Sequence, residues 1–244
     1  MRDLSPAELL DIRDRGQGLH PVDRALLLLS AARNGDGGEP DALPLGEANR
    51  RLLELRARTF GPRLEVRVDC PACAERLELS LAAAELAGPA RPSTGVDEVV
   101  LEEDGWRVAC RLLTPADLRA AAAHGDEDAA RAALVRLAVR EAAREGSAVD
   151  PASLPDGVLA ALGARLLESD PLAELLLEMG CPACGARWEA PLEPADFLWA
   201  ELEAEAARLL REVHVLASAY GWTEPQVLAL PAPRRRAYLE MVGA

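Results

Sequence analysis

Two short cysteine motifs hold the residues of this chain best suited to chemistry. Cys70-Pro71-Ala72-Cys73 is followed later by Cys181-Pro182-Ala183-Cys184. Two residues between cysteines let both sulfurs face one point, and proline stiffens the turn. Four thiolates from two such turns satisfy the tetrahedral coordination of a structural zinc ion. The sequence therefore predicts one zinc site whose ligands are Cys70, Cys73, Cys181 and Cys184.

The distance between the motifs departs from an ordinary zinc ribbon, in which about 15 to 20 residues separate the cysteine pairs. Here 107 residues separate Cys73 from Cys181. The segments around both motifs nevertheless repeat the same alternation of apolar and polar residues. A shift of 111 residues places Leu64, Val66, Val68, Leu77, Leu79 and Leu81 on Leu175, Leu177, Met179, Trp188, Ala190 and Leu192. One strand–turn–strand unit is thus used twice, and we expect the two cysteine pairs to meet in space.

Other uses of the four cysteines are two disulfides or a metal site that has been lost. A thiol-redox enzyme would need a cysteine of low pKa at a helix N-terminus, whereas both motifs lie between predicted strands. Four thiolates leave no open coordination position for catalysis at the metal. The sequence also has no G-x-S-x-G or H-E-x-x-H motif and no phosphate-binding glycine loop. We therefore expect no catalytic residues and no enzymatic activity.

The composition limits the partners of the chain. Its 244 residues include 41 acidic side chains and 27 basic ones, all arginine, for a net charge of -14. This balance argues against general binding to nucleic acid. The first residues lack an apolar run of signal-peptide length, and the most apolar run, residues 25–29, is too short to cross a bilayer. We expect a cytoplasmic protein that does not bind membranes.

The low aromatic content of 3% favours a helical core of Leu, Val and Ala. Capping signals and apolar periodicity predict helices at 6–16, from 21 through 29, at 47–60, from 115, and at 126–145, 155–167, 194–221, 226–230 and from 233. Besides the two cysteine hairpins, a hairpin is expected at 99–113. Loops are expected at 34–44 and 88–95.

These elements predict an α+β fold, mostly helical, with a small antiparallel sheet of hairpins joined by a zinc-ribbon-like four-cysteine site. The chain divides into N-terminal helices (1–62), the first cysteine hairpin and a second hairpin (63–113), a helical insert (114–170), and the second cysteine hairpin with the C-terminal helices (171–244). We expect these parts to form one integrated domain.

Several individual residues are interpreted as structural. Cys110 falls on the apolar face of a strand and is expected to be a small core residue. His20 is expected to cap a helix or lie in a loop, and His214 to be a partly buried helix residue. Solvated faces are expected for the four arginines of helix 47–60, for Glu201, Glu203 and Glu205, and for Arg234–Arg236. The buried stripe of helix 126–145 is expected to contain Ala130, Leu134, Leu137 and Ala138.

A further set of motifs spreads over most of the chain and is densest after residue 170. It comprises Leu43–Gly46, Phe60-Gly61, both cysteine motifs, Asp170-Pro171, Glu212–His214, Tyr220–Trp222 and the closing Leu-Pro and Arg-Arg. In these features the sequence resembles the T-even-type phage baseplate hub proteins and hub assembly chaperones, which are found in contractile-tail phages and actinobacterial contractile injection systems. The resemblance implies a small non-enzymatic protein that binds hub or spike proteins, either as a factor that helps build the baseplate hub or as a component of the phage-tail-like particle.

The candidate partner surface is the region around Tyr220, Trp222 and Arg234–Tyr238, because aromatic and arginine side chains often anchor interfaces. The alternative function is a zinc-ribbon regulator that binds nucleic acid. Such a regulator needs a clustered basic face, and Arg234–Arg236 is the candidate for it.

Overall fold

The computed structural model describes residues 2–33, 38–88 and 98–243. Helices dominate, and the strands form small antiparallel sheets, as the sequence predicts. The longer helices are α1 (Pro6–Gly16), α2 (Pro21–Ala31), α3 (Leu45–Phe60), α5 (Pro115–Ala122), α6 (Glu127–Ala138), α7 (Asp156–Ser169), α8 (Pro194–Tyr220) and α10 (Ala232–Gly243). The short ones are η1 (Pro40–Ala42), α4 (Ala83–Ala87), η2 (Pro151–Ser153), η3 (Pro171–Ala173) and α9 (Glu224–Leu228).

The described strands form three separate sheets where the sequence analysis expected one. The pairs are β1 (Arg63–Asp69) with β2 (Arg76–Ala82) and β7 (Leu176–Gly180) with β8 (Arg187–Pro191). The third sheet has the order β3 (Val99–Glu103), β4 (Trp106–Cys110), β5 (Val139–Arg144), β6 (Ser147–Ala148). The difference has a simple reason: hairpins that meet through cysteine side chains need no backbone hydrogen bonds between them.

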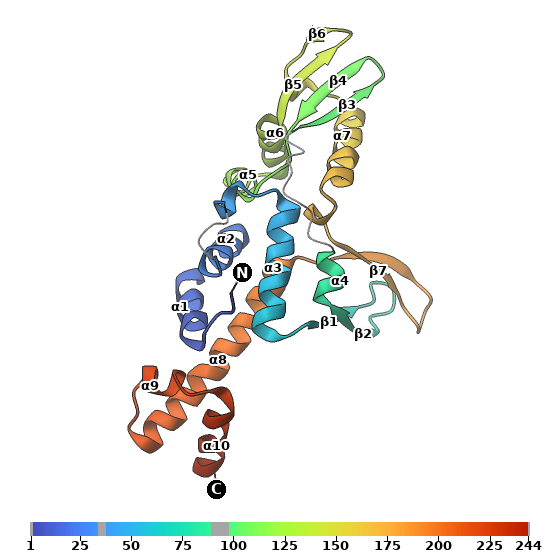
Figure 1. The fold of residues 1–244 in the computed structure, drawn as a ribbon. Coiled ribbons are helices and arrows are strands. Elements are labelled where there is room, and N and C mark those ends of the chain that lie inside the picture. The colour runs from blue at the N-terminus through green and yellow to red at the C-terminus, as the bar shows by residue number, and fades with distance from the viewer. Residues whose placement is uncertain (1, 34–37, 89–97, 244) are drawn as a thin grey trace.

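Helix α8 runs from beside α3 to the C-terminal helices α9 and α10 (Figure 1). The apolar stripe predicted for this helix is confirmed at Leu198, Leu202, Leu209 and Leu216, which are fully buried, but not at its last residue, Tyr220, which is 40% exposed. Helices α1, α2 and α3 pack on α8, and α9 and α10 contact its C-terminal part. The main hydrophobic core therefore forms around α8 from helices at both ends of the chain.

The N-terminus of α3 is capped by a residue far along the sequence. The backbone N–H of Gly46 donates to Asp170 Oδ2 at 2.9 Å, and Asn49 Nδ2 donates to the carbonyl oxygen of Leu172 at 2.9 Å. A Cβ on Gly46 would lie 1.9 Å from Asp170 Oδ1, so only glycine leaves room for this carboxylate. The contact ties the start of α3 to the segment that leads into β7.

The expectation that all arginines of α3 face solvent is wrong for Arg56. Its side chain is only 5% exposed, and its Nη2 lies 2.6 Å from Glu201 Oε1 on α8. Arg56 Nη1 also donates to the carbonyl oxygens of Gly61 and Arg63, where α3 passes into β1. A guanidinium can be buried when its donors are satisfied in this way. Glu201 is correspondingly a partner of a buried cation and does not belong to a solvated face.

The predicted helix 126–145 is wrong beyond Ala138. Residues Val139–Arg144 form β5 and pair with β4, so tertiary pairing overrides a local sequence that suits a helix. Glu145 and Gly146, with φ of 50° and 80°, make the tight turn into β6. Leu137, expected in the buried stripe, is 39% exposed.

Three single residues and two loops were also predicted from the sequence. Cys110 is fully buried and His20 caps α2, as predicted. His214 is exposed, which corrects the expectation of partial burial, because it lies on the side of α8 away from the core. The predicted loop 34–44 contains η1, and its residues 34–37 lie outside the described residues, as do 89–95 of the predicted loop 88–95.

The first prediction concerns Gly46→Ala. A methyl group would force Asp170 away from the Gly46 N–H. We therefore expect the free energy of unfolding, measured in urea, to fall by about 0.5–2 kcal/mol, the usual value of an N-cap hydrogen bond. The matched control is Gly163→Ala in α7, where nothing lies within 4 Å of an added Cβ. That change should stabilise the chain by about 0.4–1 kcal/mol. Equal effects of the two substitutions would contradict the capping role of Asp170.

Candidate metal centre

The two cysteine hairpins share one backbone register. In β1–β2, Val66 faces Leu79 and Val68 faces Leu77, and in β7–β8 Leu177 faces Ala190 and Met179 faces Trp188. These are the partners that the 111-residue shift predicts. The structure therefore confirms that a strand–turn–strand unit occurs twice.

The turns themselves are also equivalent. The Cys70 N–H donates to the Glu75 carbonyl oxygen at 2.8 Å, and the Cys181 N–H donates to that of Ala186 at 2.9 Å. The residue after the second cysteine has a positive φ in both turns, 59° at Ala74 and 74° at Gly185. Each turn thus presents its two sulfurs in the same way.

The structure brings the four predicted cysteines together. All four Sγ atoms lie within 4.8 Å of one another. The Cys70–Cys184 distance is 3.7 Å and the Cys73–Cys181 distance is 3.6 Å, so each of these contacts joins one hairpin to the other. Sulfurs at about 2.3 Å from a tetrahedral metal are about 3.8 Å apart, which matches these contacts. A disulfide needs about 2.0 Å, and every cysteine in the described chain is free.

The burial of the cysteines follows the repeat. Cys70 and Cys181, the first cysteine of each turn, are buried, whereas Cys73 and Cys184 are exposed. An ion held by all four would therefore be covered by the protein on one side and lie close to solvent on the other.

The ionisation of the thiols favours a cation at their centre. Burial raises the pKa of Cys70, but the N–H groups of Ala72 and Cys73 together with the neighbouring thiols outweigh it and lower the pKa to about 7. At Cys73 the Glu75 N–H lowers the pKa, yet the neighbouring thiols and burial raise it to about 12. Four adjacent sulfurs cannot all ionise without a compensating positive charge. A divalent cation supplies that charge, so the cluster could hold a metal ion.

The arginine run near the C-terminus behaves differently from the prediction. Arg235 is 2% exposed, its Nε donates to Glu212 Oε2 at 2.9 Å, and its Nη1 donates to the Leu230 carbonyl oxygen at 2.6 Å. Arg234 and Arg236 are exposed. The expected solvated face is thus wrong for Arg235, because Glu212 on α8 supplies a partner inside the packing of α8 and α10.

Beside these arginines lies a cluster of three aromatic rings. Tyr220 stacks on Trp222 with ring centroids 4.7 Å apart, and Tyr238 meets Trp222 edge-on at 4.9 Å. Tyr220 remains 40% exposed. The residues predicted to form a partner surface therefore include a compact group of three aromatic rings where the end of α8 meets α10.

Comparisons with protein-family models, with curated proteins and with solved structures gave no match to this chain. Within the described ranges 2–33, 38–88 and 98–243, no helix combines the length and apolar character that crossing a bilayer requires.

The second prediction is that Cys73→Ser and Cys184→Ser each lower both the metal content and the unfolding temperature of the whole chain. The two residues lie on different hairpins but contribute to one cluster, so losing either weakens the same centre. Cys110→Ala is the matched control, because Cys110 lies in a separate hydrophobic cluster and should leave the metal content unchanged. Loosening of only the mutated hairpin, seen by hydrogen exchange, would contradict a shared centre.

Proposed function

We propose that the cysteine cluster holds one structural zinc ion and that the chain is a non-enzymatic protein that acts by binding other proteins. The approach of the four Sγ atoms to within 4.8 Å of one another carries this proposal. Four protein thiolates complete the coordination of zinc and leave no position for a reacting water. Zinc binding to such a site is worth on the order of 10 kcal/mol. That suffices to hold together two hairpins that belong to separate sheets.

We propose further that the chain assists assembly of the baseplate hub of a contractile tail or injection system, or forms part of it. The resemblance to baseplate hub proteins and hub assembly chaperones supports this proposal. Contacts among the motif residues add to that support: Gly46 bonds Asp170, and Glu212 pairs with the closing Arg235. Residues that hold one fold together are expected to occur together in the sequences that adopt it.

The proposed contact surface for a hub or spike protein is the aromatic group of Tyr220, Trp222 and Tyr238 with the exposed Arg234 and Arg236. Partly exposed Tyr and Trp rings bring large apolar area at low cost in side-chain entropy, and arginine adds directional hydrogen bonds. With Arg235 engaged by Glu212, only two arginines of the run remain for an outside partner. This gives little support to a role in nucleic-acid binding.

The third prediction is that elemental analysis of purified protein finds about one zinc per chain. Iron also occupies tetrahedral four-sulfur sites and would reveal itself by a coloured protein, so the measurement separates the two metals. Removal of the metal with a chelator should lower the unfolding temperature. A metal-free, fully folded protein with four reactive thiols would contradict the zinc proposal.

The fourth prediction is that tagged protein isolated from the producing cell recovers a hub or spike component. Tyr220→Ala should reduce the recovery, because it removes the ring stacked on Trp222 from the proposed surface. Leu137→Ala is the control, since Leu137 has nearly the same exposure, 39%, and lies on α6 in another part of the molecule. Recovery of nucleic acid without any tail protein would count against the assembly role.

A further inference from the structure

The first cysteine hairpin serves as an internal standard for the second, because both have the same backbone register. On the outward face of β1–β2, three of the four pairs of opposed residues are joined by a side-chain hydrogen bond. Ser80 Oγ donates to Glu65 Oε1 at 2.6 Å, Arg67 Nε to Glu78 Oε1 at 3.0 Å and Arg76 Nε to Asp69 Oδ1 at 3.3 Å. This face satisfies its own polar groups.

The equivalent face of β7–β8 has lost all three pairings. The opposed residues are Leu176 with Pro191, Glu178 with Glu189, and Gly180 with Arg187. Within the described residues, neither the two glutamates nor Arg187 makes a side-chain hydrogen bond or ion pair. Leu176 is 45% exposed. The same backbone thus carries a face whose charged side chains have no partner among the described residues.

The central pair of this face is unfavourable. Glu178 and Glu189 lie directly opposite each other, where β1–β2 has Arg67 and Glu78. Cys181 N–H bonds Ala186 and Leu192 N–H bonds Leu175, so Glu178 and Glu189 occupy a non-hydrogen-bonded position between them. Side chains are closest at such positions, and like charges placed there destabilise a hairpin.

The outward face of the four-stranded sheet β3–β6 gives a second comparison. In the β3–β6 sheet, Arg107 lies between Glu102 and Glu141, at 3.0 Å and 3.4 Å from their carboxylates. An arginine therefore offsets two neighbouring acidic side chains there. On β7–β8 no such residue is placed between Glu178 and Glu189.

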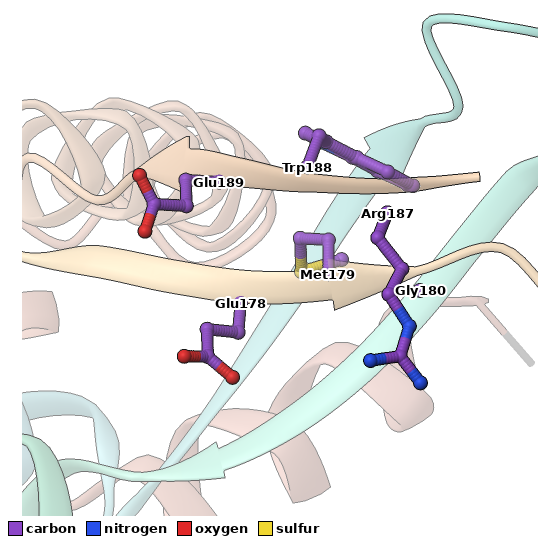
Figure 2. Close-up of a pocket in the computed structure, with 6 residues that line it drawn as sticks. All are labelled: Glu178, Met179, Gly180, Arg187, Trp188 and Glu189. Atoms are coloured by element: carbon purple, nitrogen blue, oxygen red, sulfur yellow. The ribbon is translucent and has the colours of Figure 1, made fainter.

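The same stretch of β7–β8 borders an open hollow of about 600 Å³. Figure 2 shows the Glu178 and Glu189 carboxylates on neighbouring strands, with the Arg187 guanidinium apart from both. The hollow is lined by Glu178, Met179, Gly180, Arg187, Trp188 and Glu189. Acidic groups therefore adjoin a space large enough for side chains of another molecule.

We propose that the outward face of β7–β8 is a docking surface for a protein segment that presents a basic side chain flanked by apolar ones. The basic group would relieve the repulsion between Glu178 and Glu189, and apolar neighbours would cover Leu176 and Pro191. Residues that serve a partner commonly break the local rules that stabilise a fold. The segment lies across the face and does not add a strand beside β8, because Pro191 lacks the N–H that strand addition would use.

This inference deepens the proposed function by naming the chemistry of a partner, and it rests on that function in taking the partner to be a protein. The probe that tests it is a fluorescein-labelled Leu-Arg-Leu-Arg-Leu peptide, followed by anisotropy at low salt. A Leu-Glu-Leu-Glu-Leu peptide is the counter-probe. The wild-type chain should bind the basic peptide and ignore the acidic one.

Two variants with the same change in net charge locate the binding. Glu178→Arg places an arginine opposite Glu189 and should weaken basic-peptide binding about tenfold or more, because attraction becomes repulsion at the docking face. Glu78→Arg makes the same substitution on the first hairpin and should change the affinity less than about twofold. Equal weakening by both variants would show general attraction to an acidic protein and overturn the proposal. Failure of the wild-type chain to bind would also overturn it.

Thermal unfolding of the same variants separates binding from folding. Glu178→Arg should keep or raise the unfolding temperature, because it recreates the Arg67–Glu78 pairing in the second hairpin. Glu78→Arg should lower it by opposing two arginines. The proposed function has its own readouts, zinc content and recovery of a hub or spike protein. If both variants weaken peptide binding equally while zinc content and recovery of a hub or spike protein stay normal, the docking inference is contradicted and the proposed function is not.

Discussion

The meeting of four cysteine sulfurs at one point is the constraint on which the arrangement of this chain depends. Each hairpin contributes only two sulfurs, and the hairpins lie in separate sheets. Two further contacts draw the same parts of the chain together: Asp170 caps α3, and Arg56 on α3 pairs with Glu201 on α8. Cysteine cluster, helix cap and buried ion pair thus connect the α3–β2 segment to the η3–α8 segment.

The sequence was most informative where a short repeat controls structure. An alternation of period two and a two-residue cysteine turn fix the strand register, so the 111-residue shift predicted both hairpins and the four-cysteine cluster. Capping boxes likewise predicted where α1 and α5 begin. Features that depend on distant partners were missed. Arg56 and Arg235 are buried only because Glu201 and Glu212 receive them, and β5 forms only because β4 is available.

The charged face of β7–β8 shows a different limit of prediction. The acidic residues at 178 and 189 and the arginine at 187 are plain in the sequence. The strand register shows that they occupy the positions of Arg67, Glu78 and Arg76 in the other hairpin. Once both hairpins are superimposed by their shared spacing, the lost pairings could be read from the sequence as well.

The lobe made of the β3–β6 sheet, α6 and α7 has a particular place in the chain topology. Its hydrophobic cluster is separate from the one around α8, and the chain enters and leaves it between the two cysteine turns. A metal ion bound by both Cys73 and Cys181 would therefore close a loop of chain that contains the lobe. In the chain-entropy model, closing a loop of about 100 residues raises the free energy of the unfolded chain by about 4.7 kcal/mol. Such a closed loop would make the folding of the lobe less costly in chain entropy when the metal is bound than when it is removed.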